Sequence, residues 1–313
     1  MKTPRVLGWL LLGALGLALP GAAVAGHGQE AERTTYREVT DETGRVVRVP
    51  ARLERLVSLA PNLTEIIYAL GLEERLVGVT TVCDFPPAAR AKPKVGDVTN
   101  PNLERIVELK PDLVLGTPAG NRRETADALE HLGVPVYGID PHSVNDIFTS
   151  IQHVAELAGV PEAGQELATR LQARLAALPA PRESSGRPRV LFIVWLEPLV
   201  TVGGNTFLND VLERAGAESI TANLAQGWPQ LSVEEVIERD PDYLVVPRTP
   251  PLEARMADLA RRPPWQRLRA VEQNRIIWLD EAVLRPGPRI VEAIEELARA
   301  LHPDAFARQE AGR

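Results

Sequence analysis

The chain has 313 residues, a formal net charge of −7 and only 4% aromatic residues. This length suits one large domain or two modest lobes, and the acidic balance argues against binding to nucleic acid or to an anionic membrane surface. The single cysteine, Cys83, cannot form an internal disulfide, so we interpret it as a small buried apolar residue.

The first 25 residues have the features of an export signal. Lys2 and Arg5 precede an apolar run over residues 6–19, and the small residues Ala23 and Ala25 stand at the positions that a signal peptidase inspects. The run is shorter than the roughly 20 residues that a membrane-spanning helix needs. We therefore predict cleavage after Ala25 and a mature protein outside the cytoplasm.

Strand and helix patterns follow in the same order in both halves of the chain. The segment "YREVTDETGRVVRVP" predicts a hairpin with "DETGR" as its turn. The strand "RLVSLA" then precedes a helix, "NLTEIIYALGL", for which Asn62 and Glu65 form a capping-box pair and Gly71 marks the end. In the second half, "RVLFIVW" and "LVTVG" precede the helix "TFLNDVLERAGA", which ends at Gly216.

A longer motif occurs twice without a gap, 130 residues apart. Residues 102–115 read "NLERIVELKPDLVL" and residues 232–246 read "SVEEVIERDPDYLVV". Asn102 and Ser232 suit the helix N-cap, the following prolines end each helix, and the apolar runs indicate buried parallel strands. The unit is helix, turn, strand, and its duplication predicts two similar α/β lobes with mainly parallel sheets.

The region between the halves is predicted to be mostly helical. A helix over about 162–178 carries Ala163, Leu167, Leu171 and Leu175 in one stripe, so it can lie across both lobes as a single long backbone helix. The predicted organisation is a signal peptide (1–25), a flexible mature N-terminus (26–35), an N-terminal α/β lobe (36–142), a linker with the backbone helix (143–186), a C-terminal α/β lobe (187–303) and a tail (304–313).

The combination of these motifs resembles a known family. The hairpin, "RLVSLAPNLTEIIYALGLEERLVGVT", "CDFPPAA", "NLERIVELKPDLVL", "WPQLSVEEVIERDPDYLVV" and "RPGPRIVEAIEELAR" resemble periplasmic substrate-binding proteins of ATP-driven (ABC) importers of the helical-backbone class. Within this class the chain is most similar to the cobalamin receptors. The resemblance implies a periplasmic binding protein, not an enzyme, that holds a corrinoid between its lobes and delivers it to a membrane permease.

Ligands of α/β sheets bind beyond the carboxyl ends of the strands, which points to the loops after the strands as the site. Phe85, Trp195 and Trp228 are aromatic residues in such loops, and flat rings suit the face of a corrin or another macrocycle. The resemblance implies cleft positions for Phe85 and Trp228, but Val98 and Thr117 stand where the cobalamin receptors have tryptophans. The remaining predicted ligand-binding residues are Asn62, Glu281 and Arg285.

Other ligand classes remain open. A ferric siderophore would attract basic residues such as Arg285, and haem would need a tyrosine or histidine in the cleft, whereas Tyr68 and Tyr137 are expected in the lobe interiors. We predict no bound metal, because the histidines fall mostly on helices or beside them, and no resident cofactor. A chelatase-like two-lobed enzyme ranks lower, since the chain lacks nucleotide-binding, nucleophile-elbow and paired-cysteine motifs.

The duplicated motif also carries a prediction about the partner. Glu104 and Glu234 stand two residues after the two helix caps, and the resemblance implies that such paired glutamates dock arginines on the two subunits of the permease dimer. A monomeric receptor would then present one carboxylate from each lobe to a two-fold symmetric partner. The alternative is that each glutamate only complements the helix dipole.

Overall fold

The computed structural model describes residues 35–180, 186–259 and 261–311. The predicted signal peptide and the predicted flexible segment as far as residue 34 lie outside these ranges. Within them, no helix is both long and apolar enough to cross a membrane. The described part opens with the predicted hairpin, in which β1 (Tyr36–Thr40) pairs antiparallel with β2 (Val46–Pro50), and the Asp41 carboxylate accepts the backbone N–H groups of Thr43 and Arg45 in the turn.

The N-terminal lobe is built on a four-stranded parallel sheet of strand order β4-β3-β5-β6. All four strands are largely buried, which explains their continuous apolar runs. Its elements in chain order are β3 (Leu56–Ser58), α1 (Pro61–Ala69), η1 (Glu73–Arg75), β4 (Leu76–Val79), η2 (Pro87–Ala91), α2 (Leu103–Glu108), β5 (Leu113–Gly116), α3 (Arg123–His131) and β6 (Val136–Gly138).

The C-terminal lobe repeats this topology, with a parallel sheet of order β10-β7-β11-β12. In each sheet, the strand that comes second in the chain (β4 or β10) lies at one edge, and the strand that comes first (β3 or β7) lies beside it. The elements are β7 (Arg189–Phe192), β8 (Trp195–Leu196), β9 (Leu199–Val200), α6 (Phe207–Arg214), β10 (Glu218–Ser219), α7 (Val233–Arg239), β11 (Tyr243–Arg248), α8 (Pro250–Leu259), α9 (Pro263–Gln266), α10 (Arg269–Glu272), β12 (Ile276–Asp280), η4 (Glu281–Leu284), α11 (Ile290–Leu301) and α12 (Pro303–Ala311).

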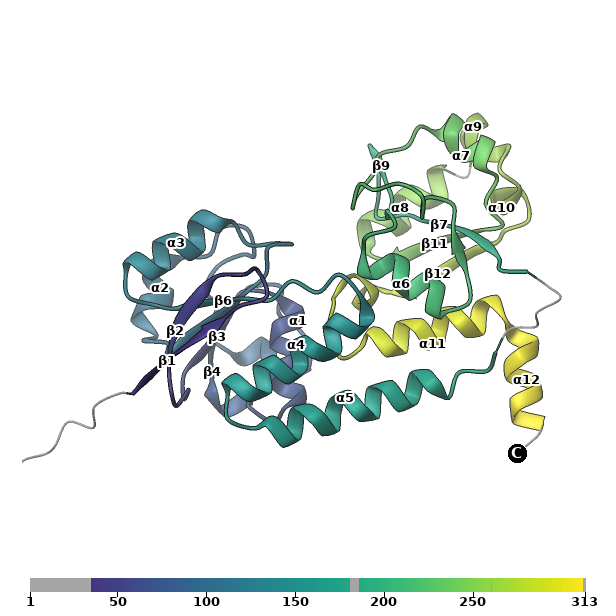
Figure 1. The fold of residues 1–313 in the computed structure, drawn as a ribbon. Helices are drawn as coiled ribbons and strands as arrows, with labels where there is room; N and C mark the ends of the chain where they lie inside the picture. Colours follow the sequence, from purple (N-terminus) through teal and green to yellow (C-terminus); the bar gives the residue numbers. More distant parts are fainter. Residues whose placement is uncertain (1–34, 181–185, 260, 312–313) are drawn as a thin grey trace, which may run out of the picture. The chain divides into compact units, whose positions relative to one another are not determined.

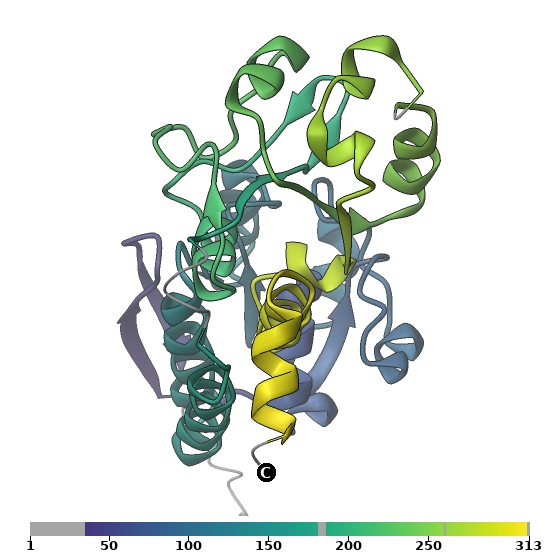
Figure 2. The same ribbon diagram turned by 90° about the vertical axis from the view of Figure 1, so that its right-hand side faces the viewer.

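Long helices join the two lobes (Figures 1 and 2). α4 (Val144–Leu157) packs on α5 (Pro161–Ala176), and α5 in turn contacts α11 of the C-terminal lobe. Arg174 on α5 donates two hydrogen bonds, of 2.8 and 3.1 Å, to the Glu295 carboxylate on α11. One apolar core contains residues of both sheets and of α4, α5 and α11, so the predicted backbone helix is part of a continuous core.

The ends of the joining region differ slightly from expectation. α5 begins at Pro161 and ends at Ala176, close to the predicted 162–178, and Gly159 separates it from α4 with a φ of 74° that favours glycine. The segment predicted as a tail contains a helix, α12, because Ala305 and Phe306 have apolar surface to bury.

The duplicated motif forms the same structure in both lobes. The Asn102 side chain accepts a hydrogen bond from the Arg105 N–H at the start of α2, and Ser232 with Glu235 forms the full capping box at the start of α7. Both N-cap predictions are therefore confirmed. Lys110 and Asp240, the residues before the two prolines, have φ values of 47° and 42°. A residue in the left-handed conformation therefore follows each helix.

The aspartates of the two Pro-Asp pairs also play matching roles. One oxygen of the Asp112 carboxylate accepts the N–H groups of Glu54 and Arg55 at 2.7 and 2.8 Å, just before β3. The Asp242 carboxylate accepts the N–H of Arg189 at 2.9 Å, at the start of β7. Each aspartate thus fixes the register between the third strand of its lobe and the first, which gives the repeat a structural function.

The prediction for the start of α1 is wrong. Its N-cap is Ala60, with Pro61 in the first turn and no side-chain capping bond, because proline is already in helical conformation and brings no N–H that needs an acceptor. Asn62 and Glu65 therefore do not form a capping box. Both side chains instead contact the C-terminal lobe.

Candidate functional site

Three aromatic side chains stand out in the segments that follow strands of the two sheets. Phe85, Trp195 and Trp228 are 40%, 41% and 51% exposed, and all three belong to the few large apolar side chains that are exposed in the described residues. Phe85 lies in the loop after β4, Trp195 begins the short strand β8 that follows β7, and Trp228 lies in the loop between β10 and α7. Exposed rings of this size in loops are more typical of binding surfaces than of folding.

The Trp195 side chain and the backbone around Trp228 both make contacts with neighbouring residues. The Trp195 indole N–H donates to the Glu197 carbonyl at 3.0 Å, and the Arg255 guanidinium lies 5.5 Å from the ring centroid. The backbone on both sides of Trp228 is fixed, since the carbonyls of Gly227 and Pro229 accept hydrogen bonds of 2.9 and 3.0 Å. Both rings are therefore presented from ordered backbone, as a preorganised binding surface requires.

The segments after β3 and β12 meet and join the lobes through a buried charge cluster. The Glu65 carboxylate on α1, 3% exposed, accepts hydrogen bonds of 2.9 and 2.8 Å from Arg289 and one of 3.2 Å from Arg285. Arg285 also donates to Asp84 at 2.9 Å and to Glu281 at 2.7 Å. Two arginines of the C-terminal lobe thus bind two carboxylates of the N-terminal lobe.

These contacts shift the pKa values of the cluster. Burial lowers the pKa of Arg285, but its hydrogen bonds and ion pairs with Asp84 and Glu65 outweigh burial and raise it. The hydrogen bonds from Arg289 to Glu65 likewise raise the pKa of Arg289. Burial raises the pKa of the Asp84 carboxyl, yet Arg285 more than offsets this and holds that pKa below its usual value. The arginines are therefore held as cations by their partners.

The structure places the other predicted site residues at this junction. The Asn62 amide donates to the Pro286 carbonyl at 3.3 Å, and Asn62 is almost fully buried. The Arg285 side chain is 15% exposed and already forms ion pairs with carboxylates. One of these is Glu281, whose side chain is 41% exposed. Asn62 and Arg285 thus join the lobes, and the exposed aromatic rings offer more surface to a ligand.

Sequence reasoning missed Glu65, Asp84 and Arg289. Glu65 was assigned to a helix cap, and nothing in the sequence pairs it with arginines more than 200 positions later. One local signal could have indicated a shared acidic partner: two arginines, Arg285 and Arg289, stand four residues apart just before α11.

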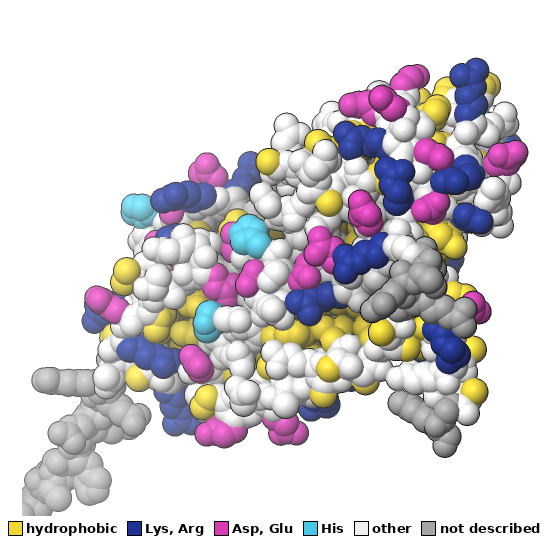
Figure 3. Space-filling model, turned by 45° about the vertical axis from the view of Figure 1, so that its right-hand side comes forward, with side chains coloured by type: hydrophobic (Ala, Val, Ile, Leu, Met, Phe, Trp, Pro, Cys, Tyr) yellow, Lys and Arg dark blue, Asp and Glu magenta, His cyan; other side chains and the backbone are white. Residues whose placement is uncertain are grey.

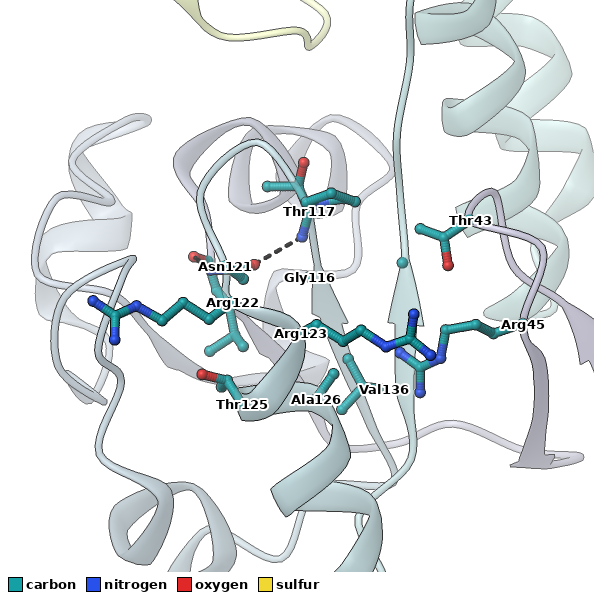
Figure 4. A pocket seen from close by; sticks show the side chains of 13 residues that line it. Thr43, Arg45, Gly116, Thr117, Asn121, Arg122, Arg123, Thr125, Ala126 and Val136 are labelled. Carbon is teal, nitrogen blue, oxygen red and sulfur yellow. Dashed lines mark hydrogen bonds between the residues drawn. The ribbon is translucent and has the colours of Figure 1, made fainter.

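A small hollow lies at the carboxyl ends of β5 and β6 in the N-terminal lobe (Figure 4). Its volume is about 250 Å³, below the roughly 300–1,000 Å³ of drug-sized ligand pockets. Arg123 and Arg45 reach toward one another on one side of it, and Arg122 points the other way (Figure 4). The loop after β5 is closed by the Asn121 side chain, which accepts the Thr117 N–H at 2.7 Å. The hollow is large enough for a substituent of a macrocycle, not for the ring itself.

The structure offers little for direct metal capture. No group of three or more His, Cys, Asp or Glu side chains within the described ranges could hold a metal ion. Tyr137 is buried, and burial together with nearby Glu42 raises its pKa to about 12, while Tyr68 packs partly buried against the core. Tyr137 lies in the lobe interior as predicted, whereas Tyr68 is only partly buried, and Cys83 is buried and free.

The two glutamates of the duplicated motif are exposed. Glu104 and Glu234 lie in the first turns of α2 and α7, and neither makes an ion pair with another residue of the described ranges. Acidic and basic side chains are interspersed over the face of the molecule in Figure 3, and many charged groups elsewhere are paired. Glu104 and Glu234 are thus exposed at equivalent positions of the two lobes.

Comparison with known proteins identifies the family. A family model described as periplasmic binding protein matches residues 56–283. The chain belongs to this family. The match begins at β3 and ends in η4, so it contains both sheets, the joining helices and the three exposed aromatic residues.

Individual relatives cover most of the chain. A vitamin B12-binding protein of Vibrio parahaemolyticus is 33% identical over 247 residues, which is 78% of this chain and 88% of the relative. An uncharacterized ABC transporter substrate-binding lipoprotein of Bacillus subtilis, YvrC, is 32% identical over 277 residues, 86% of each chain. Among solved structures, the periplasmic haem-binding protein RhuT of Roseiflexus matches with a TM-score of 0.71 at 32% identity, over 80% of this chain and 99% of its own.

Proposed function

We propose that this periplasmic binding protein captures a corrinoid between its two lobes and delivers it to an ABC transporter in the membrane. The observation that carries the proposal is the set of exposed rings in segments that follow strands of the two sheets, Phe85 from one lobe and Trp195 and Trp228 from the other. Flat rings stack on a flat, largely apolar macrocycle and remove both surfaces from water. The similarity to a vitamin B12-binding protein supports the same ligand class.

Haem is the second candidate, since a solved relative of similar fold is named a haem-binding protein. Iron in haem is usually held by an axial tyrosine, histidine, cysteine or methionine. Within the described ranges, Tyr137 is buried and Tyr68 packs partly buried against the core, so neither tyrosine is among the exposed aromatic side chains. Arg285 and Arg289, which could have met propionates or a siderophore, are already paired with carboxylates.

An enzymatic role is less well supported. The relatives described above are named as binding proteins, and the cluster around Glu65 has its arginines paired with carboxylates and leaves no general base poised for proton transfer. We infer that the protein returns its ligand chemically unchanged. A chelatase would convert the bound macrocycle, which extraction of the ligand after denaturation would reveal.

The transporter contact follows from the repeat. We propose that Glu104 and Glu234 bind arginines of the two permease subunits, one from each lobe of a monomeric receptor in the periplasm. Both carboxylates are exposed on matching helices, and electrostatic complementarity of this kind fixes orientation and speeds association.

The experiment that tests the ligand is a titration of the purified mature protein with cobalamin, cobinamide, haemin and a ferric siderophore. Binding is followed by tryptophan fluorescence and calorimetry. We expect the corrinoids to bind and to quench the fluorescence, because two of the three proposed contacts are tryptophans. Tight binding of haemin with no binding of either corrinoid would replace the proposed ligand with haem.

A further inference from the structure

Arg289 occupies a position between two groups that the other lobe supplies. Its guanidinium carbon lies 3.9 Å from the centroid of the Phe85 ring. The same guanidinium donates to both oxygens of Glu65, at 2.9 and 2.8 Å. Arg289 precedes α11, whereas Phe85 and Glu65 belong to the N-terminal lobe.

This arrangement leaves the guanidinium little freedom. A planar guanidinium that binds a carboxylate through two parallel hydrogen bonds is fixed in orientation as well as in position. Glu65 is itself held, because it is 3% exposed and also accepts from Arg285. The cation is therefore presented to the ring by a rigid, buried anchor.

The Phe85 ring is backed by this cation and is still 40% exposed. A ring on a loop would otherwise rotate and move with the loop, and ordering it on binding would cost side-chain entropy. Attraction between the cation and the ring reduces that cost before the ligand arrives.

We infer that Arg289 and Glu65 are positioning residues for ligand stacking on Phe85, an inference that rests on the proposed corrinoid function. Neither residue has to touch the ligand. Together they fix the exposed aromatic ring of the N-terminal lobe from the C-terminal lobe, so the stacking surface is complete only when both lobes are in register.

The chain offers a matched control in Arg285. This arginine binds the same Glu65 and is similarly buried, at 15% against 17% for Arg289. Its other partners are Asp84 and Glu281, and the contact to the Phe85 ring belongs to Arg289. A purely structural role of the cluster would therefore affect both arginines alike.

The test is a double-mutant cycle on the affinity for cobalamin, measured by calorimetry, with R289K, F85L and the double variant, and a second cycle with R285K and F85L. Lysine keeps the charge but cannot hold both Glu65 oxygens and lie flat on the ring. We expect R289K to weaken binding about three- to tenfold when Phe85 is present and by less than about twofold when F85L is present. R285K should have the same effect in both backgrounds.

An equal effect of R289K with and without F85L, in a receptor that binds cobalamin, would overturn the inference and leave the proposed function intact. Absence of corrinoid binding by the unaltered protein would instead refute the proposed function, and the inference with it. Circular dichroism checks that each variant is folded. If R289K does not fold, R289Q supplies the cycle, because its amide still donates to Glu65 without the charge.

Discussion

Removal of Glu65 is the sharpest perturbation of the contact between the lobes. The substitution Glu65→Ala takes away one buried carboxylate that accepts three charge-assisted hydrogen bonds from two arginines. Arg285 keeps Asp84 and Glu281 as partners, while the remaining ion pair of Arg289 is with Asp280, 3.5 Å away and 65% exposed at its side chain. The loss therefore falls mainly on Arg289.

Breaking a buried ion pair by removing one partner typically costs about 3–5 kcal/mol, because a buried charge is left unpaired. Since Arg285 retains two carboxylates, we expect the lower end of this range, a fall of about 3 kcal/mol in the free energy of unfolding. Removing both partners, Glu65→Ala with Arg289→Ala, should cost less than Glu65→Ala alone. The double variant leaves no unpaired guanidinium at this place.

The free energy of unfolding is measured by guanidinium denaturation, followed by far-ultraviolet circular dichroism and by tryptophan fluorescence. Glu104→Ala is the control, because that exposed carboxylate has no ion pair within the described ranges, and its effect should stay within about 0.5 kcal/mol. If Glu65→Ala unfolds at the same denaturant concentration as the unaltered protein, the cluster does not hold the lobes together and the reasoning fails.

Three further predictions concern ligand, transporter and pH. Trp228→Ala should weaken corrinoid binding by roughly 1–3 kcal/mol in calorimetry if the ring is a buried anchor in the complex; unaltered affinity would remove Trp228 from the site. Glu104→Arg with Glu234→Arg should abolish transporter-dependent uptake while ligand affinity stays intact, and normal uptake would show that the repeat has no docking role. Arg285 outweighs burial and holds the pKa of Asp84 below its usual 3.8. A lowered folded-state pKa contributes stability above the unfolded-state pKa, and this is lost as the pH falls through the folded-state value. Asp84→Asn should therefore flatten the loss of stability below about pH 4; an unchanged acid profile would contradict this.

Local sequence signals predicted the lobes well because each signal acts within a few residues. The caps at Asn102 and Ser232, the helix-ending prolines and the buried strands all depend on neighbours in the chain. The error at α1 has the same origin. Asn62 and Glu65 have the spacing of a capping box, but the helix begins at Pro61, two residues earlier than that box requires, and this leaves both side chains available for other partners.

The site could be predicted only in part, because its contacts cross the chain. Exposed aromatic residues after strands were identified from position and composition, and Phe85, Trp195 and Trp228 are indeed exposed. Which charged residues meet depends on how the two sheets approach each other. Glu65 and Arg289 are 224 positions apart, and no periodicity or spacing rule joins residues at that separation.

The two lobes are alike in the duplicated motif and different in the segments proposed to bind the ligand, and the proposed partners explain why. The helices α2 and α7 both begin with a side-chain N-cap and carry Glu104 and Glu234 at equivalent positions, as a two-fold symmetric permease would require. The parts proposed to face the ligand have no such match. One lobe supplies Phe85, and the other supplies two tryptophans and the arginines that bind Glu65. A corrinoid has two different faces and unequal edges, so identical halves could not complement it, whereas identical docking points suit a partner built from two copies of one subunit.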